Sequence, residues 1–284
     1  MPLTALVTGA TDGIGRATAL ELARCGYTVH ALGRNAQRGE ETLAELRAIS
    51  SAQHELFLTD LAALAETRRF LDEYAAAHQA LDLLILNANA VTGKVSATAD
   101  GIETTFAVGY LSRYLFSLKL NALLAAGDQA RVVHVGGTLL ASNIPYDSLS
   151  NPRFGILKAT SLANTADTYL VHYLHELALT TVPHEMVTPG VVNTRQVREQ
   201  VWPIRLLSRL FGLIEPDEAG KRLVSHIRQT DAAGVAGRAF HLEKPRTVKL
   251  GRGDPLEKCR RLIAFTESFT GVKVSDHLEV NGGA

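Results

Sequence analysis

A glycine-rich segment near the N-terminus constrains the fold more than any other feature of this sequence. Residues 8–15 read Thr-Gly-Ala-Thr-Asp-Gly-Ile-Gly and separate a short apolar run, residues 3–7, from a helix-periodic stretch, residues 14–25. Glycines let a backbone turn tightly and approach a pyrophosphate, and the N-terminus of the following helix attracts its negative charge. Since this is the first strand–helix turn of an alternating pattern, it predicts a dinucleotide-binding site.

Strand and helix patterns alternate along the rest of the chain. Strands are predicted at residues 27–32, 55–58, 81–86, 131–135 and 185–187, and helices at 42–49, 62–78, within 101–126, and at 164–179. With right-handed crossovers, this order predicts an α/β fold with a doubly wound parallel sheet of the Rossmann type. No linker, repeat or low-complexity tract interrupts it, so residues 1–284 are expected to form a single domain.

The composition of the chain argues against several classes of protein. The 284 residues carry 29 Lys and Arg against 29 Asp and Glu, which gives no electrostatic attraction to nucleic acid or to an anionic membrane. Two cysteines and no Cys/His cluster indicate neither a disulfide framework nor a metal site. The sequence shows no apolar run long enough to span a membrane and no signal-peptide pattern. We therefore expect a cytoplasmic protein without a stable membrane anchor.

The end of the second predicted strand bears on cofactor choice. It reads Gly33-Arg34-Asn35, at the position that meets the adenosine ribose in dinucleotide folds. An acidic residue there favours a free 2′-hydroxyl, whereas an arginine accommodates a 2′-phosphate. Arg34 therefore predicts NADP(H), and Arg16 in the first helix is a further candidate for the phosphate.

These motifs resemble the short-chain dehydrogenase/reductase superfamily. The loop at residues 8–15 matches the family's TGxxxGIG, and segments 59–61, 86–89 and 189–194 match its later cofactor motifs, while segments 100–108 and 144–149 are similar to its retinol-dehydrogenase-like branch. The resemblance implies a substrate lid around residues 195–215 and a homo-oligomer paired through two long helices. It also implies a set of cofactor-binding residues: Gly9, Thr11, Asp12, Gly13, Ile14, Gly15, Arg34, Asp60, Leu61, Asn87, Ala88, Pro189, Gly190, Val192 and Thr194.

The family's catalytic tetrad of Asn, Ser, Tyr and Lys is missing from this sequence. Aligned on the family motifs, these positions fall on Gly109, Gly137, Ala163 and Asp167. None of the seven tyrosines has a lysine four residues later, so the Tyr-x-x-x-Lys motif is absent in any register. The resemblance therefore implies a cofactor site without the usual proton donor.

The loss of that donor limits the chemistry that we expect. Reducing a ketone leaves an alkoxide, which needs an acid nearby, whereas hydride transfer to an iminium neutralises a charge that is already present. Asp167 stands where the family has a cation and is our candidate catalytic residue, stabilising a cationic substrate. The alternative is that Asp167 only accepts hydrogen bonds from ribose hydroxyls or caps its helix.

Small residues at three tetrad positions also predict room for a bulky small-molecule substrate. An NADP site without the tetrad but with an added acid is similar to the reductase/Diels–Alderases of fungal prenylated-indole alkaloid pathways. That resemblance implies reduction of an iminium or azadiene intermediate and an intramolecular [4+2] cyclisation in secondary metabolism. Enzymes of that group use an arginine, for which Arg113 is a candidate, whereas Arg131 is expected to be structural.

Two other functions stay open at this stage. The chain could be an NADPH-dependent carbonyl reductase in which another residue, such as Thr138 or Lys158, replaces the tyrosine acid. It could instead be a catalytically inactive NADP-binding protein that keeps the fold and senses nucleotide or binds a partner. Turnover of simple carbonyls, or cofactor binding without turnover, separates these hypotheses.

Overall fold

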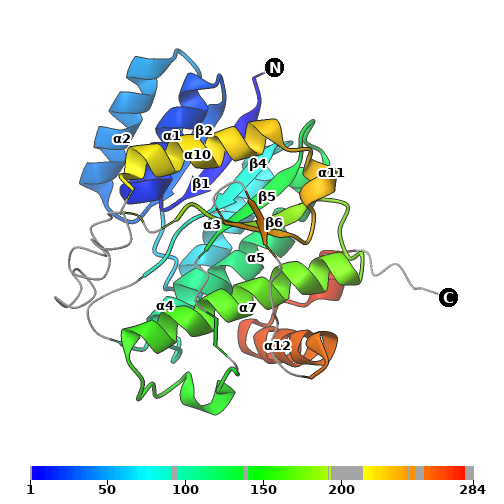
Figure 1. Cartoon of the computed structure of the whole chain (residues 1–284). Coiled ribbons are helices and arrows are strands. Elements are labelled where there is room, and N and C mark those ends of the chain that lie inside the picture. Colours follow the sequence, from blue (N-terminus) through cyan, green and yellow to red (C-terminus); the bar gives the residue numbers. More distant parts are fainter. Residues whose placement is uncertain are drawn as a thin grey trace.

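The computed structural model describes residues 2–90, 95–136, 140–141, 143–190, 192, 214–241, 244–246 and 253–278. Its centre is an eight-stranded sheet in the order β3-β2-β1-β4-β5-β6-β7-β8 (Figure 1). All neighbouring strands run parallel except the last pair, which is antiparallel. The strands are β1 (Thr4–Thr8), β2 (Thr28–Gly33), β3 (Glu55–Leu58), β4 (Leu83–Leu86), β5 (Arg131–Val135), β6 (His184–Thr188), β7 (Ala239–His241) and β8 (Lys244–Arg246).

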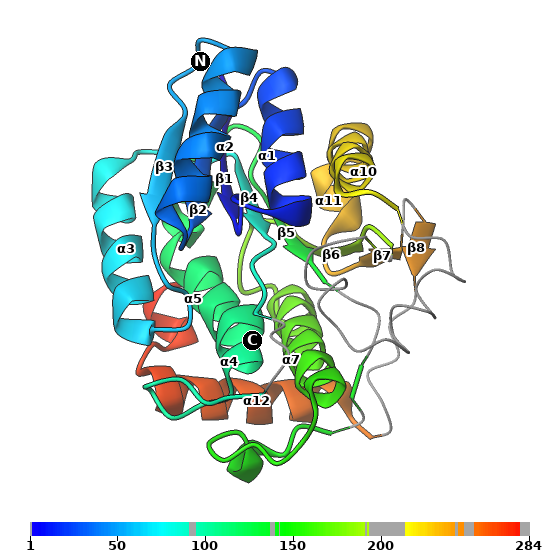
Figure 2. The same cartoon turned by 90° about the vertical axis from the view of Figure 1, so that its left-hand side faces the viewer.

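Helices cover both faces of the sheet (Figure 2). On one face lie α1 (Gly13–Arg24), α2 (Ala36–Ile49) and α10 (Pro216–Gln229), with the short α11 (Ala232–Val235) close to the far edge. On the other lie α3 (Leu64–Ala77), α4 (Thr104–Phe106), α5 (Ser112–Lys119), α6 (Asn121–Ala125), α7 (Ile156–Glu176) and α12 (Pro255–Thr270). A sheet covered on both faces explains why β4 is wholly apolar.

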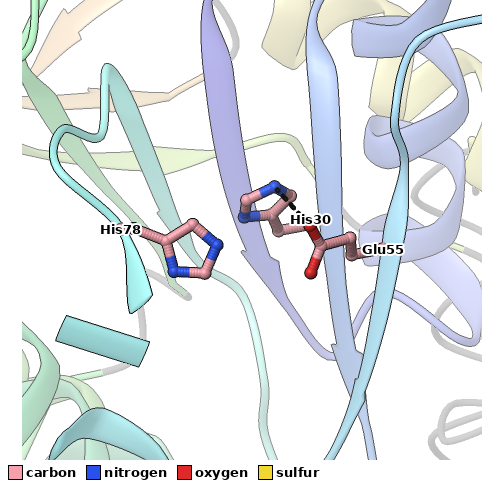
Figure 3. Close-up of side chains that lie close together, drawn as sticks. All are labelled: His30, Glu55 and His78. Atoms are coloured by element: carbon pink, nitrogen blue, oxygen red, sulfur yellow. Dashed lines mark ion pairs between the residues drawn. The ribbon is translucent and has the colours of Figure 1, made fainter. Parts of the chain in front are cut away.

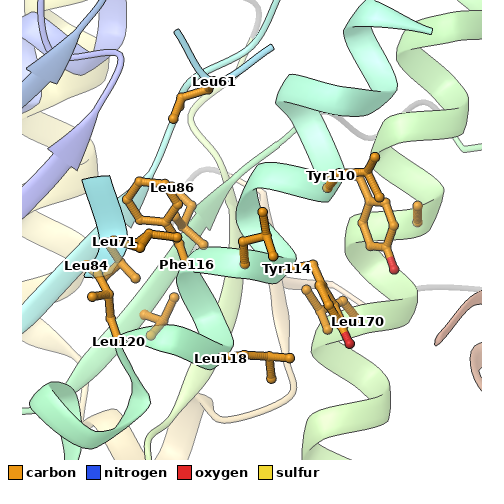
Figure 4. Packing of buried hydrophobic residues seen from close by; sticks show 14 of the residues in the cluster. Leu61, Leu71, Leu84, Leu86, Tyr110, Tyr114, Phe116, Leu118, Leu120 and Leu170 are labelled. Atoms are coloured by element: carbon orange, nitrogen blue, oxygen red, sulfur yellow. The ribbon is translucent and has the colours of Figure 1, made fainter. Parts of the chain in front are cut away.

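Each face has its own apolar core. The larger core joins the sheet to α3, α5, α7 and α12, and its centre includes Phe116, Tyr114 and Leu170 (Figure 4). The smaller one joins the sheet to α1, α2 and α10, with Leu22 and Leu46 fully buried. Successive side chains of a strand point to opposite faces of the sheet. Leu6 and Leu84 therefore lie in the first core, and their chain neighbours Val7 and Ile85 lie in the second.

The predicted doubly wound parallel sheet and single domain are confirmed, with local differences. The helix expected within residues 101–126 is a chain of segments in which α4 passes into a π-helical turn, Ala107–Leu111, before α5. Helix α7 begins at Ile156 rather than residue 164. Neither the antiparallel β8 nor helices α10 and α12 were expected. No helix in the described ranges is long and apolar enough to cross a bilayer.

Helix α10 packs closely on α1 because a glycine lies between them. A Cβ built on Gly220 would lie 2.7 Å from the carbonyl carbon of Ala17 and 2.8 Å from the amide nitrogen of Thr18, both backbone atoms. Backbone of a buried helix yields less readily than a side chain, so a methyl group here must separate the two helices. Gly220 therefore sets the distance between α1, which follows the glycine-rich turn, and α10.

We expect Gly220→Ala to lower the free energy of unfolding by about 1–3 kcal/mol, measured by urea denaturation, because the added methyl overpacks the contact between α1 and α10. Gly234→Ala in α11 is the matched control, since its Cβ would have no atom nearer than 3.5 Å. Equal stability of Gly220→Ala and the wild type would contradict this account of the helix contact.

Candidate functional site

The glycine-rich turn between β1 and α1 adopts a backbone conformation that residues other than glycine would adopt only with strain or steric clash. Gly9 and Gly13 have φ angles of +67° and +53°, in the left-handed region. At Gly15 the restriction is space, because a Cβ there would lie 2.2 Å from the carbonyl oxygen of Gly9 and 2.3 Å from Nδ2 of Asn87. The side chain of Asp12 accepts a hydrogen bond of 2.8 Å from the amide of Gly13 and caps α1.

A cleft of about 570 Å³ opens above this turn at the carboxyl ends of the parallel strands. Ligands of open α/β sheets bind at this edge, where the strand order reverses. Most of the cofactor-binding residues expected from the sequence line it: Gly9, Thr11, Asp12, Gly13, Ile14, Arg34, Asp60, Leu61, Asn87, Ala88, Pro189, Gly190 and Val192. Gly15 does not line the cleft but allows the close approach of Gly9 and Asn87, and Thr194 lies outside the described residues.

The sequence missed several residues that the cleft brings together. Val108, Gly136, Thr160, Asn164, Thr188 and His241 also line it, beside Thr59 and Asn89 of the segments matched to cofactor motifs. Gly136 and Thr188 directly follow or end strands, so the rule that ligands bind at the carboxyl ends could have found them. His241 lies beside Thr188 in the β6–β7 pairing, and nothing in the sequence indicated that pairing. Its Nδ1 is buried without a hydrogen-bond partner among the described residues.

Two arginines line the cleft at the end of β2. Arg34 is exposed there, and Arg38 donates to Oδ2 of Asp12 at 3.0 Å. Arg16 differs from expectation, because its guanidinium pairs with Glu45 of α2 and does not line the cleft. The 2′-phosphate of a dinucleotide would therefore meet Arg34 and Arg38 rather than Arg16.

The glycine positions in the walls of the cleft, and the helix that begins beside it, fit a dinucleotide. A Cβ at Gly33 would lie 2.3 Å from Cγ2 of Thr11, and one at Gly15 would push into the backbone of Gly9, so the walls keep their shape only with glycine at both positions. Helix α1 begins in the same turn, with Gly13 and Ile14 lining the cleft, and the positive end of its dipole favours an anion there. These residues would hold the pyrophosphate, and the cleft residues beyond β5 would hold the nicotinamide.

Comparison with known proteins agrees with this geometry. Residues 3–149 match the family model described as short chain dehydrogenase. The chain belongs to the short-chain dehydrogenase family. Polyprenol dehydrogenase from Mus musculus is 32% identical over 286 residues, covering 96% of this chain and 85% of the relative. Human retinol dehydrogenase 14 is 31% identical, covering 84% and 77%.

A solved structure shows the same fold. The short chain dehydrogenase from Burkholderia cenocepacia, in complex with NADP, superposes with a TM-score of 0.68 at 21% identity, covering 85% of this chain and 96% of that one. At that identity the likeness establishes the fold alone. The family membership and the fold make this chain an oxidoreductase by descent, with a fold that in this relative binds NADP.

Two of the positions aligned with the family's catalytic residues pack against each other. A Cβ on Gly109 would lie 3.1 Å from Cβ of Ala163 and 3.3 Å from Oδ1 of Asn89. The π-helical turn and α7 therefore meet closely where the family resemblance places an asparagine and a tyrosine, and neither residue here has a polar side chain. Gly137 and Thr138 lie outside the described residues. Lys158 is exposed in the first turn of α7 and does not line the cleft.

The expectation that the carboxylate of Asp167 faces the reactant is wrong. Asp167 is 1% exposed, lies outside the cleft lining, and accepts hydrogen bonds from Nη1 of Arg113 at 2.5 Å and from Nδ1 of His134 at 2.7 Å. A buried carboxylate needs a partner, and Arg113 supplies the opposite charge. Burial alone would raise the pKa of Asp167, but Arg113 and His134 outweigh it and hold the pKa below its ordinary value.

A chain of hydrogen bonds continues from Asp167 across the sheet. Because the carboxylate only accepts, Nδ1 of His134 donates to it, and Nε2 of His134 lies 3.1 Å from Nδ1 of His184, within hydrogen-bond distance. Burial lowers the pKa of His184 well below its ordinary value, so that ring is neutral. His134 is thus a hydrogen-bonded core histidine.

Arg113 links this buried pair to the cleft wall. Its Nη2 donates to the carbonyl oxygens of Ala88, at 3.2 Å, and Val135, at 2.9 Å, and both of these residues line the cleft. Asp167 therefore acts through Arg113 as a positioning residue for the ends of β4 and β5. Arg131 has the structural role that we expected, since its Nε donates to Glu185 at 2.6 Å at the opposite end of β5.

We expect Asp167→Asn to lower the free energy of unfolding by about 3–5 kcal/mol, because it leaves the buried Arg113 without a counter-charge. Chemical denaturation measures this loss. The double variant Arg113→Met/Asp167→Leu should recover much of the stability, since it removes both charges.

The pH dependence provides a second check on this pair. A carboxyl whose pKa is lowered by folding stabilises the protein fully above its ordinary pKa of 3.8, and this contribution disappears as pH falls through the lowered value. The stability difference between wild type and Asp167→Asn should therefore shrink in acid below that pH. A neutral effect of Asp167→Asn at pH 7 would contradict the ion pair.

Proposed function

We propose that this protein is an NADP(H)-dependent oxidoreductase that acts without the tyrosine acid of its family, on a bulky substrate that needs no proton from the enzyme. The observation that carries the proposal is a combination: most of the expected cofactor-binding residues line the cleft, whereas Gly109 and Ala163 offer no proton donor near it. A nicotinamide bound in such a cleft supplies or accepts a hydride.

Selectivity for the phosphorylated cofactor rests on the residues at the end of β2. Arg34 and Arg38 both line the cleft there, and no acidic residue follows Gly33 to accept from a ribose 2′-hydroxyl. Asp12 accepts a hydrogen bond of 3.0 Å from the guanidinium of Arg38, whereas Arg34 is exposed and forms no competing ion pair within the described part of the chain. The planar guanidinium group of an arginine can donate two parallel hydrogen bonds to phosphate oxygens, and its positive charge complements their negative charge.

A preformed cation, such as an iminium, is the substrate class that such a site could reduce. It becomes neutral when it accepts a hydride, so no side chain has to donate a proton to a developing alkoxide. The carboxylate of Asp167 is not the counter-charge, because Arg113 already neutralises it. Intramolecular [4+2] cyclisation is not part of this proposal, since no contact of the described residues bears on it.

A second candidate is carbonyl or alcohol chemistry with His241 as the relocated acid or base. Its Nδ1 is buried and without a hydrogen-bond partner within the described ranges, and the residue lines the cleft beside Thr188, next to Pro189. An imidazole can exchange a proton near neutral pH. The relatives are named for polyprenol and retinol, both alcohols, which favours this chemistry. Homo-oligomer assembly and a cytoplasmic location stay predictions.

We expect Arg34→Ala to weaken NADPH binding about tenfold to a hundredfold, as the loss of a charge-assisted hydrogen bond would. NADH binding should change little, because NADH has no 2′-phosphate. Titration calorimetry on both cofactors measures the effect, and Arg24→Ala, at the exposed end of α1, is the control. Equal weakening of both cofactors would contradict the assignment of Arg34 to the phosphate.

A matched substrate pair separates the two candidate reactions. We expect a cyclic iminium to oxidise NADPH in the presence of the enzyme, and a ketone of the same ring skeleton to react at least about a hundredfold more slowly. The loss of nicotinamide absorbance reports both rates. Fast ketone reduction that disappears in His241→Gln would overturn the first candidate in favour of the second. Tight NADPH binding with no turnover of either substrate would indicate a binding protein without catalysis.

A further inference from the structure

Three side chains with metal-binding groups meet at the edge of the sheet opposite the cleft. His30 comes from β2, Glu55 begins β3, and His78 directly follows α3, and one ligand atom from each lies within 4.8 Å of the other two (Figure 3). Nε2 of His30 and Oε1 of Glu55 are 3.9 Å apart. The residues are 25 and 23 positions apart in sequence, so no motif signalled the cluster and only the fold brings it together.

Hydrogen bonds to one tyrosine fix how the two imidazoles are presented. Nδ1 of His78 lies 2.9 Å from the carbonyl oxygen of Tyr74, which can only accept, so this nitrogen carries the proton and Nε2 carries the lone pair. Nδ1 of His30 lies 2.7 Å from the hydroxyl of the same tyrosine, which leaves Nε2 of His30 facing Glu55. Histidine ligands in proteins commonly have this arrangement, with the second ring nitrogen held by a backbone carbonyl or another oxygen.

We propose that His30, Glu55 and His78 form a binding site for a divalent transition metal of the zinc class. Two imidazoles and one carboxylate, with a fourth position open to water, are a known zinc ligand set. Bonds of about 2.0–2.2 Å place tetrahedral ligand atoms about 3.4 Å apart, so distances between ligand atoms must shorten by up to about 1.4 Å. Glu55 is exposed and His78 half-buried after the end of its helix, so both can move towards the buried His30.

The site is separate from the nucleotide cleft, since none of its three residues lines that cleft. A bound ion would join β2, β3 and the end of α3. The two strands already pair here, with His30 opposite Glu55, and ring packing among His30, Tyr74 and His78 connects β2 to the end of α3. The ion would therefore stabilise the first half of the sheet. This role is independent of the reaction that the cleft performs.

The test uses the full-length, tag-free chain dialysed against EDTA and then titrated with zinc chloride. We expect one zinc per chain by calorimetry and by elemental analysis after gel filtration. At a zinc concentration about 100 times Kd, the melting temperature should rise by about 5 °C or more. His30 is buried and its substitution would perturb folding, so the informative variants are His78→Ala and Glu55→Gln. The first should abolish the binding, and the second should weaken it at least about tenfold.

His172→Ala is the matched control, because His172 also lies near a glutamate, Glu176, at 3.8 Å, but on a helix surface where the described residues offer no third ligand. This variant should bind zinc like the wild type. The proposal is overturned if the wild type binds no zinc, or if either His78→Ala or Glu55→Gln binds zinc with wild-type affinity. Loss of binding in His172→Ala would likewise overturn it and place the zinc elsewhere.

Discussion

The buried pair of Arg113 and Asp167 is the interaction on which the architecture around the cleft depends. It joins α5 to α7, and through Arg113 it holds the carbonyl groups at the ends of β4 and β5. Neither charge could be buried alone, because the cost of removing one from water amounts to several kcal/mol. At the position that the family resemblance aligns with a lysine, the chain therefore holds a buried carboxylate paired with an arginine.

The two halves of the cleft differ in the residues that form them. The half that would hold the adenosine and pyrophosphate keeps its glycines, its helix N-terminus and its arginines, and its geometry tolerates little change because added Cβ atoms would meet backbone or a packed side chain. Near the other half, positions 109 and 163 carry glycine and alanine, which have no polar side chain. The described residues thus provide the walls of a nucleotide site, whereas neither of these two positions supplies a proton donor.

The sequence predicted what depends on local patterns. Periodicity gave the parallel sheet, and the turn at residues 8–15 gave the position of the cleft, because a glycine-rich strand–helix turn has few structural alternatives. Prediction from the sequence failed where contacts between distant parts of the chain determine the position of a side chain. Asp167 was expected to face the substrate because its partner, Arg113, lies 54 residues away. His241 and the cluster around His30 were missed for the same reason, since strand pairing and helix ends brought them to their sites.

A crystal structure of the protein with bound NADP⁺ tests the central claim most directly. The account predicts the dinucleotide along the glycine turn, with Asp167 still paired with Arg113 and away from the nicotinamide. A carboxylate of Asp167 released from Arg113 and turned towards the nicotinamide would contradict it, as would a cleft that holds no nucleotide at saturating concentration.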